Sequence, residues 1–462
     1  MKDLLLGRDR VQRIIKENRA NRSPGRAHGG PGLNCLVLGG GGREYAIAWR
    51  LARCASVATI DVAPGNAAMA LFTRVLDFPP SDVARIEQHC AAASIDLVIV
   101  GPDDLVAAGI GDAIRRAGVT VVCPSREAAR IESSKSFAKA LMVEAGVPTA
   151  TFTTYPDAAA ARAALAERPD GPVVVKADGL AAGKGVVVAA DRAAAQAALL
   201  RPPISEGAVV LEEPLNGPEA SLMALVDGET VVALPPARDH KRLGDGDTGP
   251  NTGGMGACSP TAVLPDDQAQ PLADRLIAPV ARTLAARGTP FRGVIFAGLL
   301  QAADGWRVLE YNARFGDPEA QVVLPRVGGD FAALMRAVGD GRLAEHVAQH
   351  PVRFSQRAYV DVALCAAGYP GSPRRGDRIS VDDLPDDVWT FHAGTRRAAD
   401  GGFLTDGGRV LHIVAQGDTV AEARRKAYVG AERVRFEGKF YRQDIAEDQL
   451  EDQLEDGVGV SS

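Results

Sequence analysis

Short apolar runs alternate with amphipathic segments through the first third of the chain. Helical periodicity separates these runs, and strands are expected at 35–38, 58–62, 97–100 and 119–122. Strands and helices that alternate in this way are typical of a parallel sheet covered by helices. We therefore expect an N-terminal parallel α/β domain over residues 34–134.

The middle of the chain shows both the helical and the strand periodicity of apolar residues. Helices are expected at 135–145, 157–167, 191–200 and 267–287, and strands at 208–212, 219–234, 292–301 and 307–312. Residues 239–260 are polar and rich in glycine, and we expect them to form a loop of a length that is rare unless it is functional. A central domain is thus expected over 135–330, with a hairpin-bearing subdomain at about 150–212.

The last third predicts a small α+β domain over 331–446, entered through a connecting helix, with strands at 357–366 and 410–415 and a helix at 419–434. Both ends are expected to be tails. Residues 1–33 are basic and finish in a Gly/Pro/Arg-rich run, which is typical of a linker or a disordered segment. Residues 447–462 are acidic and place like charges four positions apart, so we expect a solvated tail there.

Composition narrows the class of protein. The 462 residues carry a formal net charge of −6, which argues against an extended nucleic-acid surface and favours small-molecule partners. The six cysteines lack C-x-x-C spacing, which fits reduced thiols in a cytoplasmic protein. No apolar run approaches the roughly 18 residues that a membrane span needs. We therefore expect a cytoplasmic protein without a membrane segment.

Residues 173–189 read VVVKADGLAAGKGVVVA, two valine-rich strands around a glycine loop, with Lys176 on the first strand and Lys184 at the end of the loop. Glycines such as Gly183 and Gly185 let backbone N–H groups approach an anion closely. The spacing differs from a Walker A loop, which requires Ser or Thr after the lysine and then a helix. The segment predicts a β-hairpin lid over a nucleotide phosphate, although a lone Lys176 would equally suit a side chain that extends from an edge strand to water.

Three further segments could carry chemistry. In 308–319, VLEYNARFGDPE, strand alternation places Glu310 and Asn312 on one face with Arg314 close behind, a donor set that suits a hard cation and its phosphates. The 239–256 segment mixes both charge signs with many glycines, which favours a wrapped polar ligand over a solvated loop. The Gly39–Gly42 turn between a strand and a helix predicts a phosphate site.

The order of these motifs closely resembles one family. KADGLAAGKG at 176–185, EEPL at 212–215, DHKRLGDGDTGPNTGGMG at 239–256 and EYNARFGDPE at 310–319 resemble the phosphoribosylamine-glycine ligases of the ATP-grasp superfamily, and the likeness extends over about 35–445. It implies a central ATP-grasp fold between the N-terminal α/β domain and the small C-terminal α+β domain. It also implies that ATP, glycine and 5-phosphoribosylamine give glycinamide ribonucleotide, ADP and phosphate through a glycyl phosphate, a step of purine synthesis.

The resemblance also implies the cofactors and the site. ATP and Mg²⁺ (or Mn²⁺) are expected as cofactors, glycine and 5-phosphoribosylamine as the only partners, and a monomer as the working form. The metal ligands would be Glu310 and Asn312, and the catalytic residues Lys176, Asp239 and Arg314. ATP would be bound by Lys135, Lys176, Gly183, Lys184, Gly185, Glu212, Glu213, Leu215 and Glu219. The substrates would be bound by Gly40, Gly41, Gly42, Arg43, Glu44, Asp239, Lys241, Asn251 and Arg314.

Some positions differ from the family pattern, and two alternatives stay open. Tyr45 stands where the family has histidine, Asp103 where it has glutamate, and Cys258 where it has tyrosine. A biotin-dependent carboxylase subunit or a formate-using ribonucleotide transformylase would share the hairpin and the metal strand, but not the 239–256 segment. A nucleotide-binding dehydrogenase or sensor would use the first domain, yet Gly39–Gly42 lacks the full G-x-G-x-x-G spacing.

Overall fold

The computed structural model describes residues 32–181 and 185–450. Its N-terminal part confirms the predicted parallel sheet, with strand order β3-β2-β1-β4-β5 and the first strand beginning at Leu33. The strands are β1 (Leu33–Gly39), β2 (Val57–Pro64), β3 (Arg74–Val75), β4 (Leu97–Val100) and β5 (Thr120–Val122). The helices between them are α2 (Gly42–Leu51), α3 (Val83–Ala92), α4 (Asp103–Ala108) and α5 (Ile110–Arg116), with the 3-10 turn η1 at Met69–Leu71.

A four-stranded antiparallel sheet of order β11-β10-β16-β17 forms the centre of the molecule. Its strands are β10 (Glu219–Asp227), β11 (Val231–Ala233), β16 (Arg292–Ala302) and β17 (Gly305–Asn312). The single helix predicted at 267–287 is wrong, because two helices, α10 (Asp266–Leu276) and α11 (Ala278–Ala286), lie there. Pro279 explains the break, since a proline cannot donate the backbone hydrogen bond that would continue α10.

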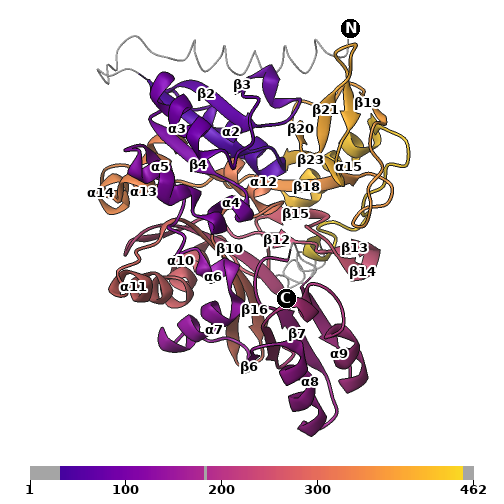
Figure 1. Ribbon diagram of the computed structural model, residues 1–462. Coiled ribbons are helices and arrows are strands. Elements are labelled where there is room, and N and C mark those ends of the chain that lie inside the picture. The colour runs from indigo at the N-terminus through magenta and orange to yellow at the C-terminus, as the bar shows by residue number, and fades with distance from the viewer. Residues whose placement is uncertain (1–31, 182–184, 451–462) are drawn as a thin grey trace, which may run out of the picture.

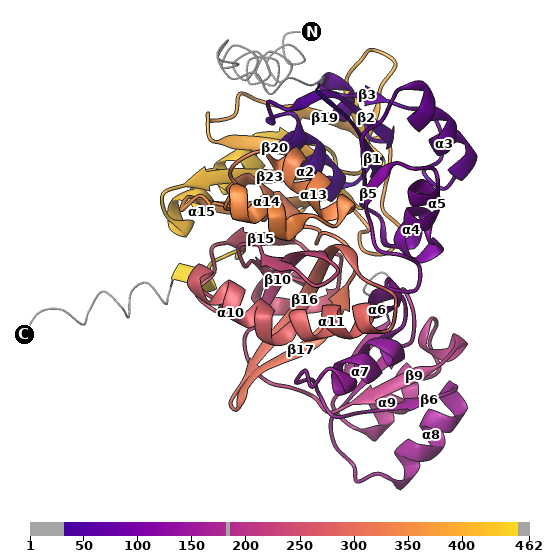
Figure 2. The ribbon, with the colours of Figure 1, turned by 90° about the vertical axis from the view of Figure 1, so that its left-hand side faces the viewer.

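The predicted hairpin subdomain is present and projects from the rest of the molecule (Figures 1 and 2). Its sheet has the order β6-β9-β7-β8, and β7 and β8 pair antiparallel with Lys176 opposite Val186. The strands are β6 (Phe152–Tyr155), β7 (Val173–Ala177), β8 (Val186–Ala189) and β9 (Val209–Glu212), with helices α8 (Ala158–Glu167) and α9 (Arg192–Ala198) and the turn η2 (Ile204–Glu206). Helices α6 (Arg130–Ser133) and α7 (Lys135–Glu144) connect it to the first domain.

The C-terminal sheet recruits strands from the middle of the chain. It has the order β12-β15-β18-β23-β20, so β12 (Arg238–Asp239) and β15 (Gly256–Ser259) extend a sheet built by β18 (Ala358–Cys365), β20 (Val388–His392) and β23 (Arg409–Gly417). Between β12 and β15 lies a hairpin of β13 (Arg242–Gly244) and β14 (Thr248–Asn251), with the turn η3 (Asp245–Asp247). The predicted loop at 239–260 is therefore wrong, because pairing with β18 gives this polar segment a strand partner that its own sequence does not announce.

The remaining elements link or cover these sheets. Helix α15 (Val420–Glu432) packs against the C-terminal sheet, and a smaller sheet of order β21-β22-β19-β24 lies beside it in Figure 1. Its strands are β19 (Arg378–Val381), β21 (Thr395–Arg397), β22 (Phe403–Thr405) and β24 (Val434–Arg435). The connecting segment contains α12 (Glu319–Val323), η4 (Leu324–Arg326), α13 (Phe331–Asp340) and α14 (Leu343–Gln349). No described helix is both long and apolar enough to cross a membrane.

The start of the predicted acidic tail is not a solvated segment. Gln449 is buried, and Asp448 forms an ion pair with Arg238 of β12. The charge pattern gave no sign of this, because the attraction comes from an arginine more than 200 residues earlier in the chain. Residues 451–462 and the expected basic tail at 1–31 lie outside the described residues.

Helix α2 joins the first domain to the last through aromatic packing. The ring of Tyr45 is buried, with its centroid 5.4 Å from that of Phe72 and 5.3 Å from that of Phe391 on β20. A tyrosine at this position therefore works as a packing residue between the two domains.

Removal of this ring should destabilise the protein. Tyr45→Ala is expected to lower the free energy of unfolding by about 3 kcal/mol or more, because it leaves a cavity in a closely packed interface. Urea unfolding followed by fluorescence measures this loss. Tyr45→Phe is the control and should cost less than about 1.5 kcal/mol, since the ring stays in place. Equal losses in the two variants would contradict a packing role.

Candidate active site

A buried charge cluster lies where the hairpin subdomain meets the central sheet. The Glu212 carboxylate at the end of β9 forms ion pairs with two ammonium groups, Lys176 Nζ at 2.9 Å and Lys139 Nζ at 3.1 Å. Lys176 Nζ also donates to the carbonyl of Leu309 on β17 at 3.3 Å. All three charged side chains are buried, so the cluster holds one more positive than negative charge and suits an additional anion.

Lys139 was missed by the sequence analysis. Burial, followed by the charge of Lys176, lowers the pKa of Lys139 to about 8 despite the nearby Glu212. Its Nζ also donates to Thr149 Oγ1 at 2.6 Å. The available signal was its position four residues after Lys135 on the same face of α7.

Lys135 and Asp178 attach the hairpin to the start of α7. Lys135 Nζ donates to the carbonyl of Gly179 at 2.9 Å, and Asp178 accepts the Ser136 N–H at 3.1 Å and its hydroxyl at 2.8 Å. Gly185 lies at the start of β8 and is buried, with room for no side chain beside Ala181. Gly183 and Lys184 lie outside the described residues.

Glu310 lies at the centre of a group of cations. Burial acts to raise its pKa, yet the charges of Lys241, Lys176, Lys135 and Arg314 outweigh burial and lower that pKa. The carboxylate therefore stays ionised. Three of these cations also pair with another acid, Lys176 with Glu212, Lys241 with Glu219 and Arg314 with Glu132.

Asn312 and Arg314 follow Glu310 at the end of β17. Arg314 Nη2 donates to Asn312 Oδ1 at 3.2 Å and forms an ion pair with Glu132 Oε1 at 3.0 Å. Glu132 also accepts the Ala313 N–H at 2.8 Å, so α6 fixes the backbone at this point. Glu132 is a second residue that the sequence analysis missed, because it lies about 180 residues from its partners.

Asp239 and Lys241 come from the 239–256 segment and are further charged groups near this site. Burial acts to lower the pKa of Lys241, but Glu219, Glu310 and Asp239 together raise it. Lys241 Nζ lies 2.9 Å from Glu219 Oε2. Burial, followed by the charge of Glu319, raises the pKa of Asp239 well above its usual range, and its Oδ1 atom is buried without a hydrogen-bond partner among the described residues.

Three predicted ligand residues lie on the rim of this region. Glu213 is exposed after β9 and accepts the Thr151 N–H at 2.8 Å. Leu215 is half-buried in the turn before β10, and Asn251 is half-buried at the end of β14, opposite Arg242.

The side chains of Arg43 and Glu44, from the first turn of α2, lie against the glycine turn that precedes this helix. The Gly41 N–H donates to Glu44 Oε2 at 2.6 Å, and Arg43 Nε donates to Glu44 Oε1 at 2.7 Å. A side chain on Gly101 would come within 1.9 Å of that carboxylate, and one on Gly42 within 2.7 Å of the Gln321 amide. The Gly41 amide therefore already has an acceptor in Glu44. The other predicted phosphate-binding residues of the turn are Gly40, Gly42 and Arg43.

Behind this turn lies a polar cluster from the C-terminal domain that the sequence analysis also missed. Asp317 Oδ2 lies 2.9 Å from Arg409 Nη2. Burial acts to raise the pKa of Asp317, but the charges of Arg409 and His412 outweigh burial and lower it. Asp361 Oδ2 lies 2.8 Å from His412 Nδ1, and both side chains are fully buried. The Asp317–Arg409 pair joins separate domains and the Asp361–His412 pair joins two strands of the C-terminal sheet, and neither pair left a local pattern in the sequence.

Comparisons with known proteins identify the family of the chain. The chain matches three domain models of phosphoribosylglycinamide synthetase, the N domain over 33–132, the ATP-grasp (A) domain over 133–320 and the C domain over 359–448. The chain belongs to the phosphoribosylglycinamide synthetase family. It is 41% identical over 431 residues to the phosphoribosylamine-glycine ligase of Rhodopirellula baltica, which covers 90% of this chain and 98% of that one. It is 42% identical over 420 residues to the ligase of Caulobacter vibrioides, covering 89% and 97%.

Solved structures support the same family fold. The phosphoribosylamine-glycine ligase of Thermotoga maritima superposes with a TM-score of 0.77 at 34% identity, covering 90% of this chain and 100% of that one. The biotin carboxylase domain of the Hydrogenobacter thermophilus 2-oxoglutarate carboxylase, solved with MgADP and bicarbonate, gives a TM-score of 0.64 at 16% identity, covering 90% and 97%. The second likeness shows a shared fold alone. The expected three-domain fold of the family, with its central ATP-grasp domain, is thereby confirmed.

Lys139 should make the stability of this family member depend on pH. Its pKa lies near 8 in the folded chain and near 10.5 in the unfolded chain, so the unfolded chain binds more protons between these values. The free energy of unfolding of the wild type, relative to Lys139→Met, should therefore rise from pH 8 to 10.5, by on the order of 1–3 kcal/mol. Urea titrations at several pH values measure the difference.

Lys426→Met is the control for this experiment. Its hydrogen bond with Glu422 raises the pKa of Lys426, so that side chain adds no stability as the pH rises through the same window. A flat difference between the wild type and Lys139→Met would show that Lys139 is not held in a cation-rich, buried position.

Proposed function

We propose that the chain is an ATP-dependent ligase that joins glycine to 5-phosphoribosylamine, giving glycinamide ribonucleotide, ADP and phosphate in purine biosynthesis. The observation that carries the proposal is the buried group of Lys139, Lys176 and Glu212, which holds two ammonium groups on one carboxylate where the hairpin subdomain meets the central sheet. Such a site can bind several phosphate oxygens and a carboxylate at once. We further propose a monomer in the cytoplasm that needs no nucleic acid or membrane partner.

ATP would lie between the hairpin subdomain and the central sheet. Lys135, Lys176 and Lys184 would neutralise its phosphates, and the Gly183 and Gly185 amides would lie against them. Beyond Glu212, the backbone toward Leu215 would face the adenine, while Glu213 and Glu219 would reach the ribose hydroxyls. The buried Lys139–Glu212–Lys176 cluster supports this placement, because it holds Lys176 at the point where β7 and β17 meet.

Glu310 and Asn312 supply the oxygen donors that Mg²⁺ (or Mn²⁺) prefers, and they would hold the ion with phosphate oxygens and water completing its coordination. Among residues 32–181 and 185–450, no group of three or more His, Cys, Asp or Glu side chains is arranged to hold a metal alone. When bound, the ion would supply charge neutralisation at the transferring phosphate. Glu310 fits this role because its surrounding cations keep it ionised.

The first chemical step would be attack of the glycine carboxylate on the γ-phosphorus of ATP, with ADP leaving. Lys176 and Arg314 would neutralise the charge on the transferring phosphoryl group, an effect that dominates catalysis of phosphoryl transfer. Asp239 would hold the glycine ammonium, and its unpartnered buried Oδ1 supports this assignment. Lys241 and Asn251 would line the same substrate pocket.

The second step would form the carbon–nitrogen bond. The amine of 5-phosphoribosylamine attacks the carbonyl carbon of glycyl phosphate, and phosphate leaves. Because water would hydrolyse this acyl phosphate, closure of the hairpin subdomain would protect it. The 5-phosphate would lie at Gly40–Gly42 beside Arg43. The Gly41 N–H, which donates to Glu44, would then donate either to both Glu44 and the phosphate or to the phosphate instead.

A substrate-omission assay tests the proposal. The purified protein with Mg²⁺ and ATP should release phosphate rapidly only when both glycine and 5-phosphoribosylamine are present. Omission of either should lower the rate to background, because phosphoryl transfer stalls without an acceptor and the intermediate is shielded without an amine. Turnover with bicarbonate or formate in place of glycine would instead favour another ATP-grasp activity.

Glu310→Ala tests the metal assignment. The variant should lower kcat by at least about a hundredfold while its thermal unfolding stays close to that of the wild type, because a metal ligand is lost and little packing changes. Glu229→Ala, in the exposed turn between β10 and β11, is the matched carboxylate control and should retain most of kcat. Wild-type kcat in Glu310→Ala at saturating Mg²⁺ would show that the ligand is misassigned.

A further inference from the structure

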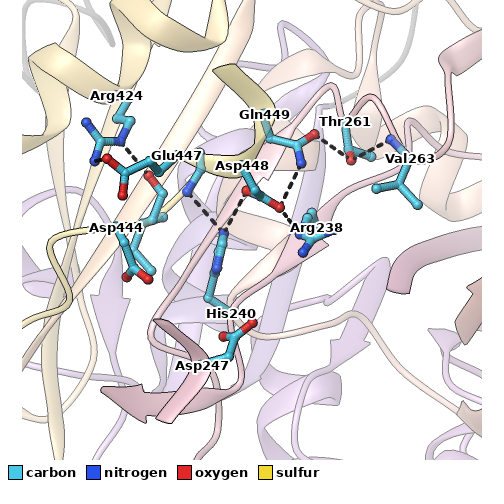
Figure 3. Close-up of polar contacts among 12 residues, drawn as sticks. Arg238, His240, Asp247, Thr261, Val263, Arg424, Asp444, Glu447, Asp448 and Gln449 are labelled. Atoms are coloured by element: carbon cyan, nitrogen blue, oxygen red, sulfur yellow. Dashed lines mark hydrogen bonds and ion pairs between the residues drawn. The ribbon is translucent and has the colours of Figure 1, made fainter. Parts of the chain in front are cut away.

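The last described residues of the chain fold back onto the 239–256 segment. We call residues 442–449 the C-terminal clasp. Figure 3 shows its Asp444, Glu447, Asp448 and Gln449 beside Arg238 and His240 of the central chain. Nothing in the proposed chemistry uses this contact, yet it is formed by charged and buried polar groups.

The first half of the clasp holds the β13–β14 hairpin. Arg442 Nη1 lies 2.7 Å from Asp247 Oδ1 and donates to the carbonyl of Arg242 at 3.1 Å. The Gly246 N–H donates to Asp444 Oδ2, and the Gln443 N–H donates to Asp245 Oδ1, each at 2.8 Å. The first arm of the hairpin, β13, and its turn η3 are therefore tied to one segment.

The second half of the clasp holds β12 and the residue that follows it. Arg238 Nε lies 2.6 Å from Asp448 Oδ2, and the Ala446 N–H donates to His240 Nε2 at 3.0 Å. Gln449 Oε1 accepts the Thr261 hydroxyl at 2.9 Å and the Ala262 N–H at 2.8 Å, beyond the end of β15 (Figure 3). The clasp thus contacts the whole segment from β12 to just past β15.

His240 is an acceptor in this contact, so its Nε2 carries no proton. Burial lowers the pKa of the imidazole, which keeps it neutral, and Asp448, Arg442, Arg238 and Asp247 are the charged groups that face it. The side chain is only 5% exposed. The Ala446 backbone that donates to it has φ +60°, a left-handed conformation that costs a non-glycine residue free energy and needs surrounding support.

That support comes from the C-terminal domain. Arg424 Nε on α15 donates to the carbonyl of Ile445 at 2.9 Å. The Tyr428 hydroxyl, on the same helix, donates to the carbonyl of Arg442 and accepts the Ile445 N–H, each at 2.9 Å. The clasp is therefore a fixed extension of the C-terminal domain against the central segment.

Strand alternation connects the clasp to the substrate pocket. Arg238 and His240 point toward the clasp, so Asp239 and Lys241 point to the other face. There, Lys241 meets Glu219, and Asp239 lies beside Glu319 and within 2.8 Å of a side-chain position on Gly254. The backbone stays extended through this point, since His240 N–H donates to Gly256 O at 3.0 Å and Met255 N–H to His240 O at 2.8 Å.

We propose that the C-terminal clasp positions the glycine-binding residues, with His240 and Asp448 as positioning residues that act through the backbone on Asp239 and Lys241. The proposal rests on the proposed function, which assigns the glycine ammonium to Asp239. A displacement of about 1 Å at a substrate-binding residue lowers the reaction rate strongly. The side chains that face the clasp must therefore be fixed if Asp239 and Lys241, on the other face, are to stay in place. The clasp makes substrate affinity depend on the docking of the C-terminal domain.

Point variants in the full chain test the clasp. Asp448→Ala and His240→Ala should each raise KM for glycine about tenfold, while KM for ATP stays within about twofold, because the ATP site lies on other elements. Glu447→Ala is the matched control. Its carboxylate is 61% exposed and pairs with Arg424 at 3.7 Å, away from the 239–256 segment, so KM for glycine should not change.

His240→Gln separates positioning from stability. A glutamine oxygen can accept the Ala446 N–H in place of Nε2, so KM for glycine should return to within about threefold of the wild type. Amide hydrogen exchange should rise over 239–256 in Asp448→Ala and His240→Ala, but not over 57–64 of the first domain. Unchanged glycine KM and unchanged exchange in both variants, even with a lower melting temperature, would overturn the proposal and leave a stabilising contact alone.

The two proposals fail in different ways. A wild-type protein without turnover on glycine and 5-phosphoribosylamine would refute the proposed function, and the exchange measurement would still report whether the clasp fixes the 239–256 segment. An active wild type whose Asp448→Ala variant keeps both KM and exchange would refute the clasp alone.

Discussion

The antiparallel pairing of β15 with β18 is the constraint on which the rest of the structure depends. It places Gly256 opposite Val362 and Ser259 opposite Tyr359, and so inserts a segment of the central domain into the C-terminal sheet. Every residue between β12 and β15 is then held at the junction of the two domains. Since backbone pairing needs no special side chains, this polar, glycine-rich stretch becomes ordered without an apolar core of its own.

Around this junction the structure concentrates charge that it does not neutralise completely. Lys139 and Lys176 share the single carboxylate of Glu212, while Lys241 pairs with Glu219 and Arg314 with Glu132. Asp239 and Glu319 are both buried acids, and burial, followed by the charge of Glu319, raises the pKa of Asp239. Such imbalance is costly in a folded protein unless a ligand of opposite charge compensates it, which is why perturbed groups gather at functional sites. An anion on one side and an ammonium on the other would restore the balance.

The fold by itself would not distinguish this family from other ATP-grasp proteins. The biotin carboxylase domain of the Hydrogenobacter thermophilus enzyme shares the overall fold at 16% identity. In this chain, the 239–256 segment meets the C-terminal clasp on its back face and carries Asp239 and Lys241 on its front face. Substrate choice in such a scaffold depends on the grafted site and not on the sheet that supports it.

The sequence by itself determined the elements whose pattern is local. The period-two runs predicted the parallel sheet, the valines and glycines around Lys176 predicted the hairpin, and the order of motifs identified the family. The roles of Glu310, Asn312 and Asp239 as ligands remain predictions.

Tertiary structure decided everything that depends on residues far apart in the chain. Lys139 became a partner of Glu212, Glu132 of Arg314, and Arg409 of Asp317 only because separate elements met in space. Residues 256–259 became a strand because β18 offered a partner, and Asp448 became part of a clasp because Arg238 faced it. Hydrophobic period and glycine spacing are properties of a few consecutive residues, whereas ion pairs and strand partners depend on which distant segments the fold brings together.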